Sequence, residues 1–149
     1  MTSGGASVAA AGTLFSSLGH RYSMPAAYSS PDAPPEEQAY SHAVEANGFL
    51  FTAGQVPMTP DGDLVEGGVE AKTRQIMRNH ESILAEADLG FDDVVKTTAY
   101  FTDIDDFEPM DETYADYFDG DYPARDVVEV ESLPAGASIE LVIVAACED

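Results

Sequence analysis

The stretch Ile139–Ala146 reads Ile-Glu-Leu-Val-Ile-Val-Ala-Ala and constrains the fold more than any other segment. A short run of aliphatic and β-branched residues predicts a strand. Apolar residues stand at both sets of alternate positions, so both faces of the sheet that holds this strand need a cover. Glu140 is the exception, because a carboxylate in such a strand is costly to bury unless it is paired or hydrogen-bonded.

The chain from Tyr40 onward alternates strand patterns with two helical patterns. Asn47-Gly48 predicts a two-residue hairpin turn. Apolar residues recur at helical spacing from Val69 to Ala87, and Gly90 is predicted to end this helix. The same spacing recurs from Phe107 to Phe118. Strands are predicted at 40–45, 49–53, 94–102, 126–133 and 139–147. The order β-β-α-β-α-β-β predicts an α+β sandwich with two helices on one face of a mainly antiparallel sheet. Two helices cover one face only, so the other apolar face predicts association with further subunits.

Residues 1–38 are rich in Ser, Ala, Gly and Pro and show no apolar periodicity. They predict a flexible N-terminal extension, followed by one folded domain over residues 39–149. Met24 is a candidate for the natural start of the protein, which would make residues 1–23 an extension. We expect removal of residues 1–23 to leave folding and activity nearly intact.

Acidic residues are spread along the whole chain. Asp+Glu number 28 against 6 Lys+Arg, a formal charge of −22. Nucleic-acid binding relies on Lys and Arg, so a nucleic-acid partner is disfavoured. The pattern predicts a halophilic protein of a salt-rich cytoplasm, since molar salt screens charges within about 3 Å; an ordinary acidic protein is the alternative.

The single cysteine, Cys147, cannot form an intramolecular disulfide, which fits a cytoplasmic location. Residues 6–18 are mildly apolar but lack the basic start of a secretory signal. No apolar run approaches the roughly 20 residues of a membrane helix, so no membrane partner is predicted.

Arg125 is the only basic residue after Lys96. Its planar guanidinium can bind a carboxylate through two parallel hydrogen bonds, which Lys cannot copy. The alternative is a structural salt bridge to Asp119, Asp121 or Asp126.

Glu140 admits two readings as well. Burial raises a carboxyl pKa toward the range that proton transfer needs, whereas a hydrogen-bonded core carboxyl or a solvent-facing edge position would be purely structural. Taken together, Arg125 and Glu140 predict a substrate clamp and an acid/base. Tyr40, taken alone, is more typical of a packing residue than of a functional one. His80 lies on the apolar side of its helix and is more typical of a hydrogen-bonded core histidine than of a ligand. No metal or cofactor motif is present.

The chain contains, in this order, Tyr40-Ser-His-Ala-Val, Leu50-Phe-Thr-Ala-Gly-Gln-Val-Pro57, Tyr122-Pro-Ala-Arg125 and Val128-Glu-Val-Glu-Ser-Leu-Pro134. Together these segments resemble the RidA (YjgF) family of reactive-intermediate deaminases. They follow the family order from about Tyr40 to Ala145. The segments Gly54-Gln-Val-Pro57 and Pro123-Ala-Arg125 with Leu133-Pro134 are together the specific part of the match.

The resemblance implies a chorismate-mutase-like fold, a homotrimer whose sheets form a central barrel, and clefts between subunits. It implies cofactor-free hydrolysis of enamine/imine products of pyridoxal-phosphate enzymes, such as 2-iminobutanoate and 2-iminopropanoate, to 2-oxo acids and ammonia. Arg125 matches the arginine that holds the substrate carboxylate. Glu140 matches the glutamate that positions the attacking water, and Tyr40 the tyrosine that lines the cleft.

The expected substrate-binding set also includes Ala53, Gly54 and Val127. Ala53 stands where many members have Ser, and Val127 where many have Cys, a position expected to act through its backbone. Asp111 replaces a frequent Asn and Asp126 a frequent Ser. These two carboxylates are expected to weaken substrate binding, less so in high salt. The alternatives are a non-catalytic small-molecule-binding or regulatory protein, and a ribonuclease or translation inhibitor, against which the charge counts.

Overall fold

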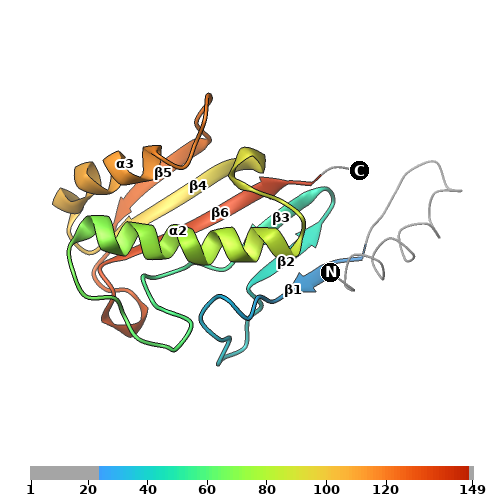
Figure 1. The fold of residues 1–149 in the computed structure, drawn as a ribbon, viewed down its shortest axis with the longest axis horizontal. Helices are drawn as coiled ribbons and strands as arrows, with labels where there is room; N and C mark the ends of the chain where they lie inside the picture. Colours follow the sequence, from blue (N-terminus) through green and yellow to red (C-terminus); the bar gives the residue numbers. More distant parts are fainter. Residues whose placement is uncertain (1–23, 148–149) are drawn as a thin grey trace, which may run out of the picture.

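The computed structural model describes residues 24–147, which form one six-stranded sheet and two α-helices (Figure 1). The expectation for residues 1–23 lies outside the described residues. In chain order the elements are β1 (Ala26–Tyr28), β2 (Ala43–Ala46), β3 (Phe49–Thr52), α2 (Val69–Glu86), β4 (Val94–Phe101), α3 (Phe107–Ala115), β5 (Ala124–Glu129) and β6 (Ile139–Ala146). Short 3₁₀ turns lie at Phe91–Asp93, Ile104–Asp106 and Pro134–Gly136.

The sheet has the order β1-β2-β3-β6-β4-β5. Every neighbouring pair is antiparallel except β4 and β5, which run parallel because α3 connects them. The predicted α+β class, with a mainly antiparallel sheet, is confirmed. The last strand of the sequence, β6, lies between β3 and β4 in the interior of the sheet, which explains why its sequence is apolar at both sets of alternate positions.

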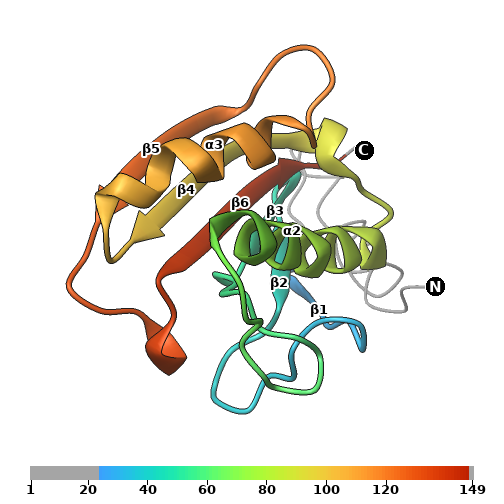
Figure 2. The ribbon, with the colours of Figure 1, turned by 60° about the vertical axis from the view of Figure 1, so that its left-hand side comes forward.

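Both helices lie on the same face of the sheet (Figures 1 and 2). α2 packs against β6 and against α3, and the Tyr114 hydroxyl of α3 is 2.8 Å from Thr97 Oγ1 on β4. Alternate residues of β6 fill the core between sheet and helices: Ile139, Leu141, Ile143 and Ala145 are all buried. They meet Ile76, Met77, Ile83 and Leu84 of α2, and Met110 and Tyr114 of α3.

The opposite face of the sheet has no helix over it in the described chain (Figure 2). Phe49 and Phe51 of β3 are 42% and 48% exposed, while Leu50 between them is buried toward the helices. Glu140 alternates with the buried Ile139 and Leu141 of β6, so its side chain also lies on this face, which we call the open face. The predicted uncovered apolar face is therefore present in the single chain.

The sequence expectation placed residues 24–38 within a flexible arm, yet the structure folds them onto the domain. β1 pairs antiparallel with β2, with Ala27 opposite Val44. Tyr28 is buried and its hydroxyl donates to Glu45 Oε1 at 2.9 Å. The folded domain therefore begins earlier than residue 39. The sequence does not reveal this, because a strand of three residues is too short to show a periodic pattern.

Turn chemistry was predicted correctly at one position and wrongly at another. Asn47 and Gly48 have φ of 54° and 83° and join β2 to β3, as the hairpin signal predicted. α2 ends at Glu86, and the left-handed residue that follows its C-cap is Asp88, at φ 60°, and not Gly90. Leu89 N–H bonds to Leu84 O and Asp88 N–H to Ala85 O, both at 3.0 Å, which is the Schellman arrangement.

None of the helices in residues 24–147 is long and apolar enough to cross a membrane.

Candidate active site

A pocket surrounds the carboxyl group of Glu140 on the open face. The loop before β2, the segment after β3 and the turn before β6 form its walls. Burial of the half-exposed Glu140 side chain raises the pKa of its carboxyl group above the ordinary value. The lining residues are Pro34, Pro35, Gln38, Tyr40, Ala53, Gly54, Gln55, Val56, Met58, Pro134, Ala135 and Glu140. A mostly apolar enclosure around one carboxyl group is suited to moving a proton near neutral pH.

Gly54 allows the Glu140 carboxyl group to lie directly against the backbone after β3. A Cβ atom at Gly54 would overlap Oε2 of Glu140. Gln55 and Leu141 hold the two segments together through a pair of backbone hydrogen bonds, with N–O distances of 2.9 and 3.0 Å. The segment after β3 thus forms a bridge to β6, and Gly54 leaves room for the carboxyl group of Glu140.

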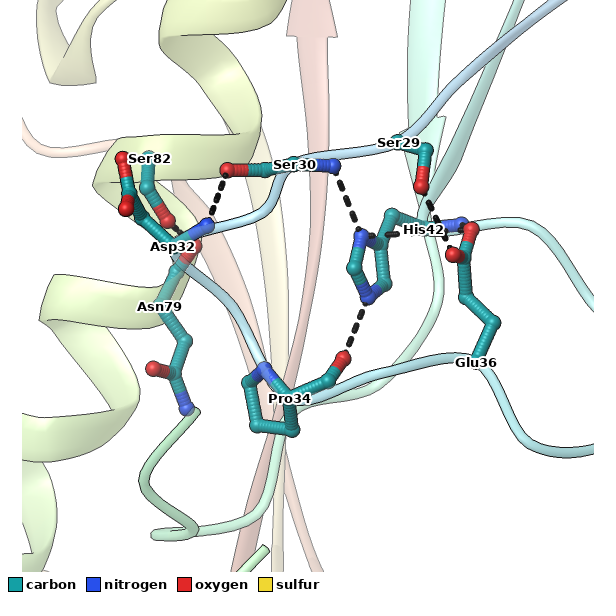
Figure 3. Close-up of polar contacts among 8 residues, drawn as sticks. All are labelled: Ser29, Ser30, Asp32, Pro34, Glu36, His42, Asn79 and Ser82. Carbon is teal, nitrogen blue, oxygen red and sulfur yellow. Dashed lines mark hydrogen bonds and ion pairs between the residues drawn. The ribbon is translucent and has the colours of Figure 1, made fainter. Parts of the chain in front are cut away.

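His42 anchors the loop that forms one wall of the pocket (Figure 3). Its buried ring accepts the Ser30 N–H at Nδ1, at 3.0 Å, and lies 2.6 Å from the Pro34 carbonyl oxygen through Nε2. A backbone N–H can only donate, so Nε2 carries the ring proton and donates to Pro34. Glu36 accepts the His42 backbone N–H at 2.9 Å and the Ser29 hydroxyl at 2.7 Å. The two ring nitrogens of His42 and its backbone N–H therefore hold the loop before β2 in position.

Two consecutive residues of α2 support the pocket from the helix side of the sheet. Asn79 and His80 are both fully buried. Asn79 Nδ2 donates to the carbonyl oxygen of Met58 at 2.9 Å, which holds the segment after β3. His80 Nε2 is 2.7 Å from the carbonyl oxygen of Leu141, the residue after Glu140. Burial lowers the pKa of His80 to about 4, so the ring is neutral near pH 7 and donates this bond.

Arg125 lies at the start of the edge strand β5, under α3. Its guanidinium carbon is 5.0 Å from the ring centre of Phe107 and 4.9 Å from that of Tyr114. Its NH1 is 2.7 Å from Oδ1 of Asp111 on α3. Two aromatic faces and one carboxylate orient the fork, as cation–π and ionic contacts do. Arg125 lines a second pocket with Asp111, Tyr114, Ala115, Tyr122 and Pro123.

The two charged residues of the predicted site do not meet within one chain. Arg125 pairs in register with Thr97, whose side chain is buried beneath the helices. Glu140 pairs with Tyr100, which follows Thr97 by an odd number of residues on β4 and therefore points to the opposite side of the sheet. The side chain of Glu140 thus lies on the open face, and that of Arg125 on the helix face. The structure thus places Arg125, the candidate anion-binding residue, and Glu140, the candidate proton-transfer residue, on opposite faces of the sheet.

The other predicted site residues lie mainly around Glu140. Tyr40, Ala53 and Gly54 line the pocket of Glu140. Burial, followed by the charges of Glu36 and Glu37, raises the pKa of the Tyr40 hydroxyl. Val127 lies two residues after Arg125 on β5, packs partly against the core and belongs to neither pocket lining.

The partner of Arg125 differs from those that the sequence suggested. Asp111 forms the ion pair, whereas Asp126 bonds to Lys96 Nζ at 3.0 Å. The approach of Asp111 follows from α3 lying over β5, which the local sequence around Arg125 does not show. His42 and Asn79 were also missed as supports of the pocket, because a buried polar side chain within an apolar pattern does not reveal which backbone group it bonds. His80 is the core histidine that its helical position predicted, except that its Nδ1 has no partner among the described residues.

Comparison with known proteins places this architecture among described relatives. Residues 30–147 match the family model described as Endoribonuclease L-PSP. A RutC family protein of Pyrococcus horikoshii is 43% identical over 115 residues, covering 76% of this chain and 91% of that protein. The 2-iminobutanoate/2-iminopropanoate deaminase of Rattus norvegicus is 41% identical over 118 residues, covering 78% and 86%.

The fold agrees with the sequence match. A crystal structure of the Rid family protein YyfA from Yersinia pestis superposes with a TM-score of 0.80 at 40% identity, covering 83% of this chain and 99% of that one. A match that spans nearly the whole described domain, with helices and strands in the same arrangement, shows common descent as well as a common shape. The chain therefore belongs to the RidA/YjgF family.

Proposed function

We propose that this protein hydrolyses 2-imino acids, the reactive products of pyridoxal-phosphate enzymes such as 2-iminobutanoate and 2-iminopropanoate, to 2-oxo acids and ammonia. The observation that carries the proposal is the half-buried Glu140 carboxyl group with its raised pKa, held against Gly54 in a mostly apolar pocket. The name of the rat relative supports the same reaction.

The reaction requires one water molecule and two proton transfers. Glu140 accepts a proton from water as the oxygen attacks the C=N carbon and passes it to the nitrogen, which gives a tetrahedral carbinolamine. It then takes the proton of the new hydroxyl group and passes it to the nitrogen as the C–N bond breaks, so that the hydroxyl becomes the carbonyl group. Ammonia leaves and a 2-oxo acid remains, so atoms and charges balance. A carboxyl group with a raised pKa exchanges protons more readily near neutral pH than an ordinary one. Arg125 holds the carboxylate group of the substrate, so that the C=N carbon meets the water in near-attack geometry.

We propose further that each site is shared between two subunits of a homotrimer. Arg125 and Glu140 lie on opposite faces of the sheet in one chain, so a single chain does not present both to one small ligand. The exposed Phe49 and Phe51 give the open face the apolar surface that subunit contact would cover. A cleft between subunits brings Arg125 of one chain toward Glu140 of the next.

A coupled assay tests the reaction. Threonine dehydratase supplies 2-iminobutanoate, and the release of 2-oxobutanoate is followed with and without the full-length protein. We expect Glu140→Gln to return the rate to the uncatalysed value while 2-oxobutanoate still binds. We expect Arg125→Ala to raise KM and to lower kcat/KM by about two orders of magnitude, a loss of about 3 kcal/mol for a charged pair. Wild-type protein that leaves the release rate unchanged would refute the proposal.

The description of the family model makes RNA cleavage the second candidate. The formal charge of −22 opposes the approach of a polyanion. A purified protein that cleaves RNA, and loses this activity in Arg125→Ala, would favour the second candidate. A protein that binds 2-oxo acids equally well with Gln at position 140 and never turns over imines would be a binding or regulatory member.

A further inference from the structure

The carboxylate of Asp111 occupies part of the candidate anion-binding site around Arg125. Its Oδ1 is 2.7 Å from NH1 of Arg125, whose side chain is 21% exposed while that of Asp111 is 46% exposed. Both residues line the same pocket. The guanidinium carries five N–H donors, so a second carboxylate can still bind through the donors that Asp111 does not use. That second carboxylate would lie next to a fixed negative charge.

We propose that Asp111 determines the affinity of this site for carboxylates. Asp111 remains on NH1 and keeps the fork oriented, and the ligand carboxylate takes the remaining donors against the repulsion of the Asp111 charge. The inference rests on the proposed role of Arg125 in holding the ligand carboxylate. Its consequence is a site that binds 2-oxo and 2-imino acids weakly in dilute buffer and more tightly in concentrated salt.

The size of the effect follows from Coulomb's law. Two carboxylates on one guanidinium lie about 5 Å apart, and at an effective dielectric of about 50 to 80, close to that of bulk water, their repulsion weakens binding about three- to tenfold. The screening length falls from about 10 Å at 0.1 M salt to about 3 Å at 1 M. Salt therefore removes most of this repulsion, whereas the ligand's contact pair with Arg125, at hydrogen-bonding distance and partly buried, is screened less.

Asp126 provides a matched control within the same strand. It follows Arg125 directly, yet its carboxylate bonds to Lys96 Nζ at 3.0 Å and its side chain lies on the other face of β5. Asp126→Asn removes the same unit of charge as Asp111→Asn without altering the pocket of Arg125. The pair of variants separates a local effect of Asp111 from the general effect of the acidic surface.

The test is calorimetric titration of 2-oxobutanoate into the full-length protein at 0.1 M and 1 M KCl. We expect Asp111→Asn, whose amide oxygen can still accept from NH1, to bind about five times more tightly than wild type at 0.1 M KCl and less than twice as tightly at 1 M. Asp126→Asn should stay within about twofold of wild type in both buffers. Asp111→Ser, which also removes the charge, provides a second variant if the first fails to fold.

Two outcomes would overturn the proposal. Equal or weaker binding by Asp111→Asn at 0.1 M KCl would mean that the charge of Asp111 assists the ligand. Failure of wild type and all variants to bind 2-oxobutanoate would refute the assigned carboxylate site. The titration needs no turnover, so tighter binding by Asp111→Asn in a protein that hydrolyses no imine would retain this inference and reject only the deaminase.

Discussion

The two ends of the candidate site are built by different physical means. Buried neutral groups position the walls around Glu140: the rings of His42 and His80 and the amide of Asn79 bond to backbone groups of the pocket. Charge positions Arg125, which pairs with Asp111 at a half-exposed edge strand. Hydrogen bonds between neutral buried groups respond little to salt, whereas partly exposed ion pairs respond strongly. The surroundings of Glu140 are therefore expected to change little with salt, and those of Arg125 to change strongly.

The largest effect is expected from filling the space between Gly54 and Glu140. A Cβ in Gly54→Ala would overlap the Glu140 carboxyl group, which is the far end of a flexible side chain. The carboxyl group should rotate away while the fold remains, because no rigid backbone atom is displaced. We expect kcat to fall by about two orders of magnitude, as for the loss of an acid/base, with a melting temperature close to that of wild type.

Gly90→Ala is the control for this substitution. Nothing lies within 4 Å of a Cβ at Gly90, and its φ of −139° is open to any residue. Its activity should equal that of wild type. Full activity in Gly54→Ala would mean that the carboxyl position seen against Gly54 is not the one that acts.

A smaller effect is expected from removing the bond behind Glu140. His80→Leu loses the donor to Leu141 O and should lower kcat about three- to tenfold, with KM little changed. His80→Gln, which retains an N–H donor, should recover much of the loss. Equal decreases in both variants, or a change confined to KM, would argue against a positioning role.

The same variant has a signature in the pH dependence of stability. The folded-state pKa of His80 is about 4, below the ordinary histidine value of 6.5, so the unfolded chain binds the proton more tightly. His80 therefore removes stability as pH falls from 6.5 to 4, by about 3 kcal/mol in total. We expect the free energy of unfolding of His80→Leu, measured in urea and relative to that of wild type, to rise by about this amount between pH 7 and pH 4. A constant difference would show that His80 is not held neutral by burial.

Local patterns predicted the elements of the fold well. The alternation in β6, the helical spacing of α2 and α3 and the Asn47-Gly48 turn each depend on residues close in sequence, and the structure confirms them. The three-residue strand β1 escaped notice because its stability comes from Tyr28 in the core and pairing with β2, which are contacts distant in sequence.

The sequence singled out the candidate site residues by type, and only the structure shows their arrangement. Arg125 and Glu140 stood out because each is a charge in an unfavourable context. Their placement on opposite faces depends on strand register, which neither residue's neighbours reveal. The same limit applies to Asp111, which reaches Arg125 only because α3 crosses β5.

Mixing two inactive variants tests the shared site most directly. Arg125→Ala and Glu140→Gln are each expected to be nearly inactive, and their subunits can be exchanged by mild denaturation and refolding at equal concentration. If each site takes Arg125 from one subunit and Glu140 from the next, every trimer that contains both chains has about one intact site in three. Because about a quarter of randomly assembled trimers contain a single kind of chain, the whole population should regain roughly a quarter of the wild-type activity. Activity no higher than that of the separate variants, in trimers shown to contain both chains, would contradict the shared site.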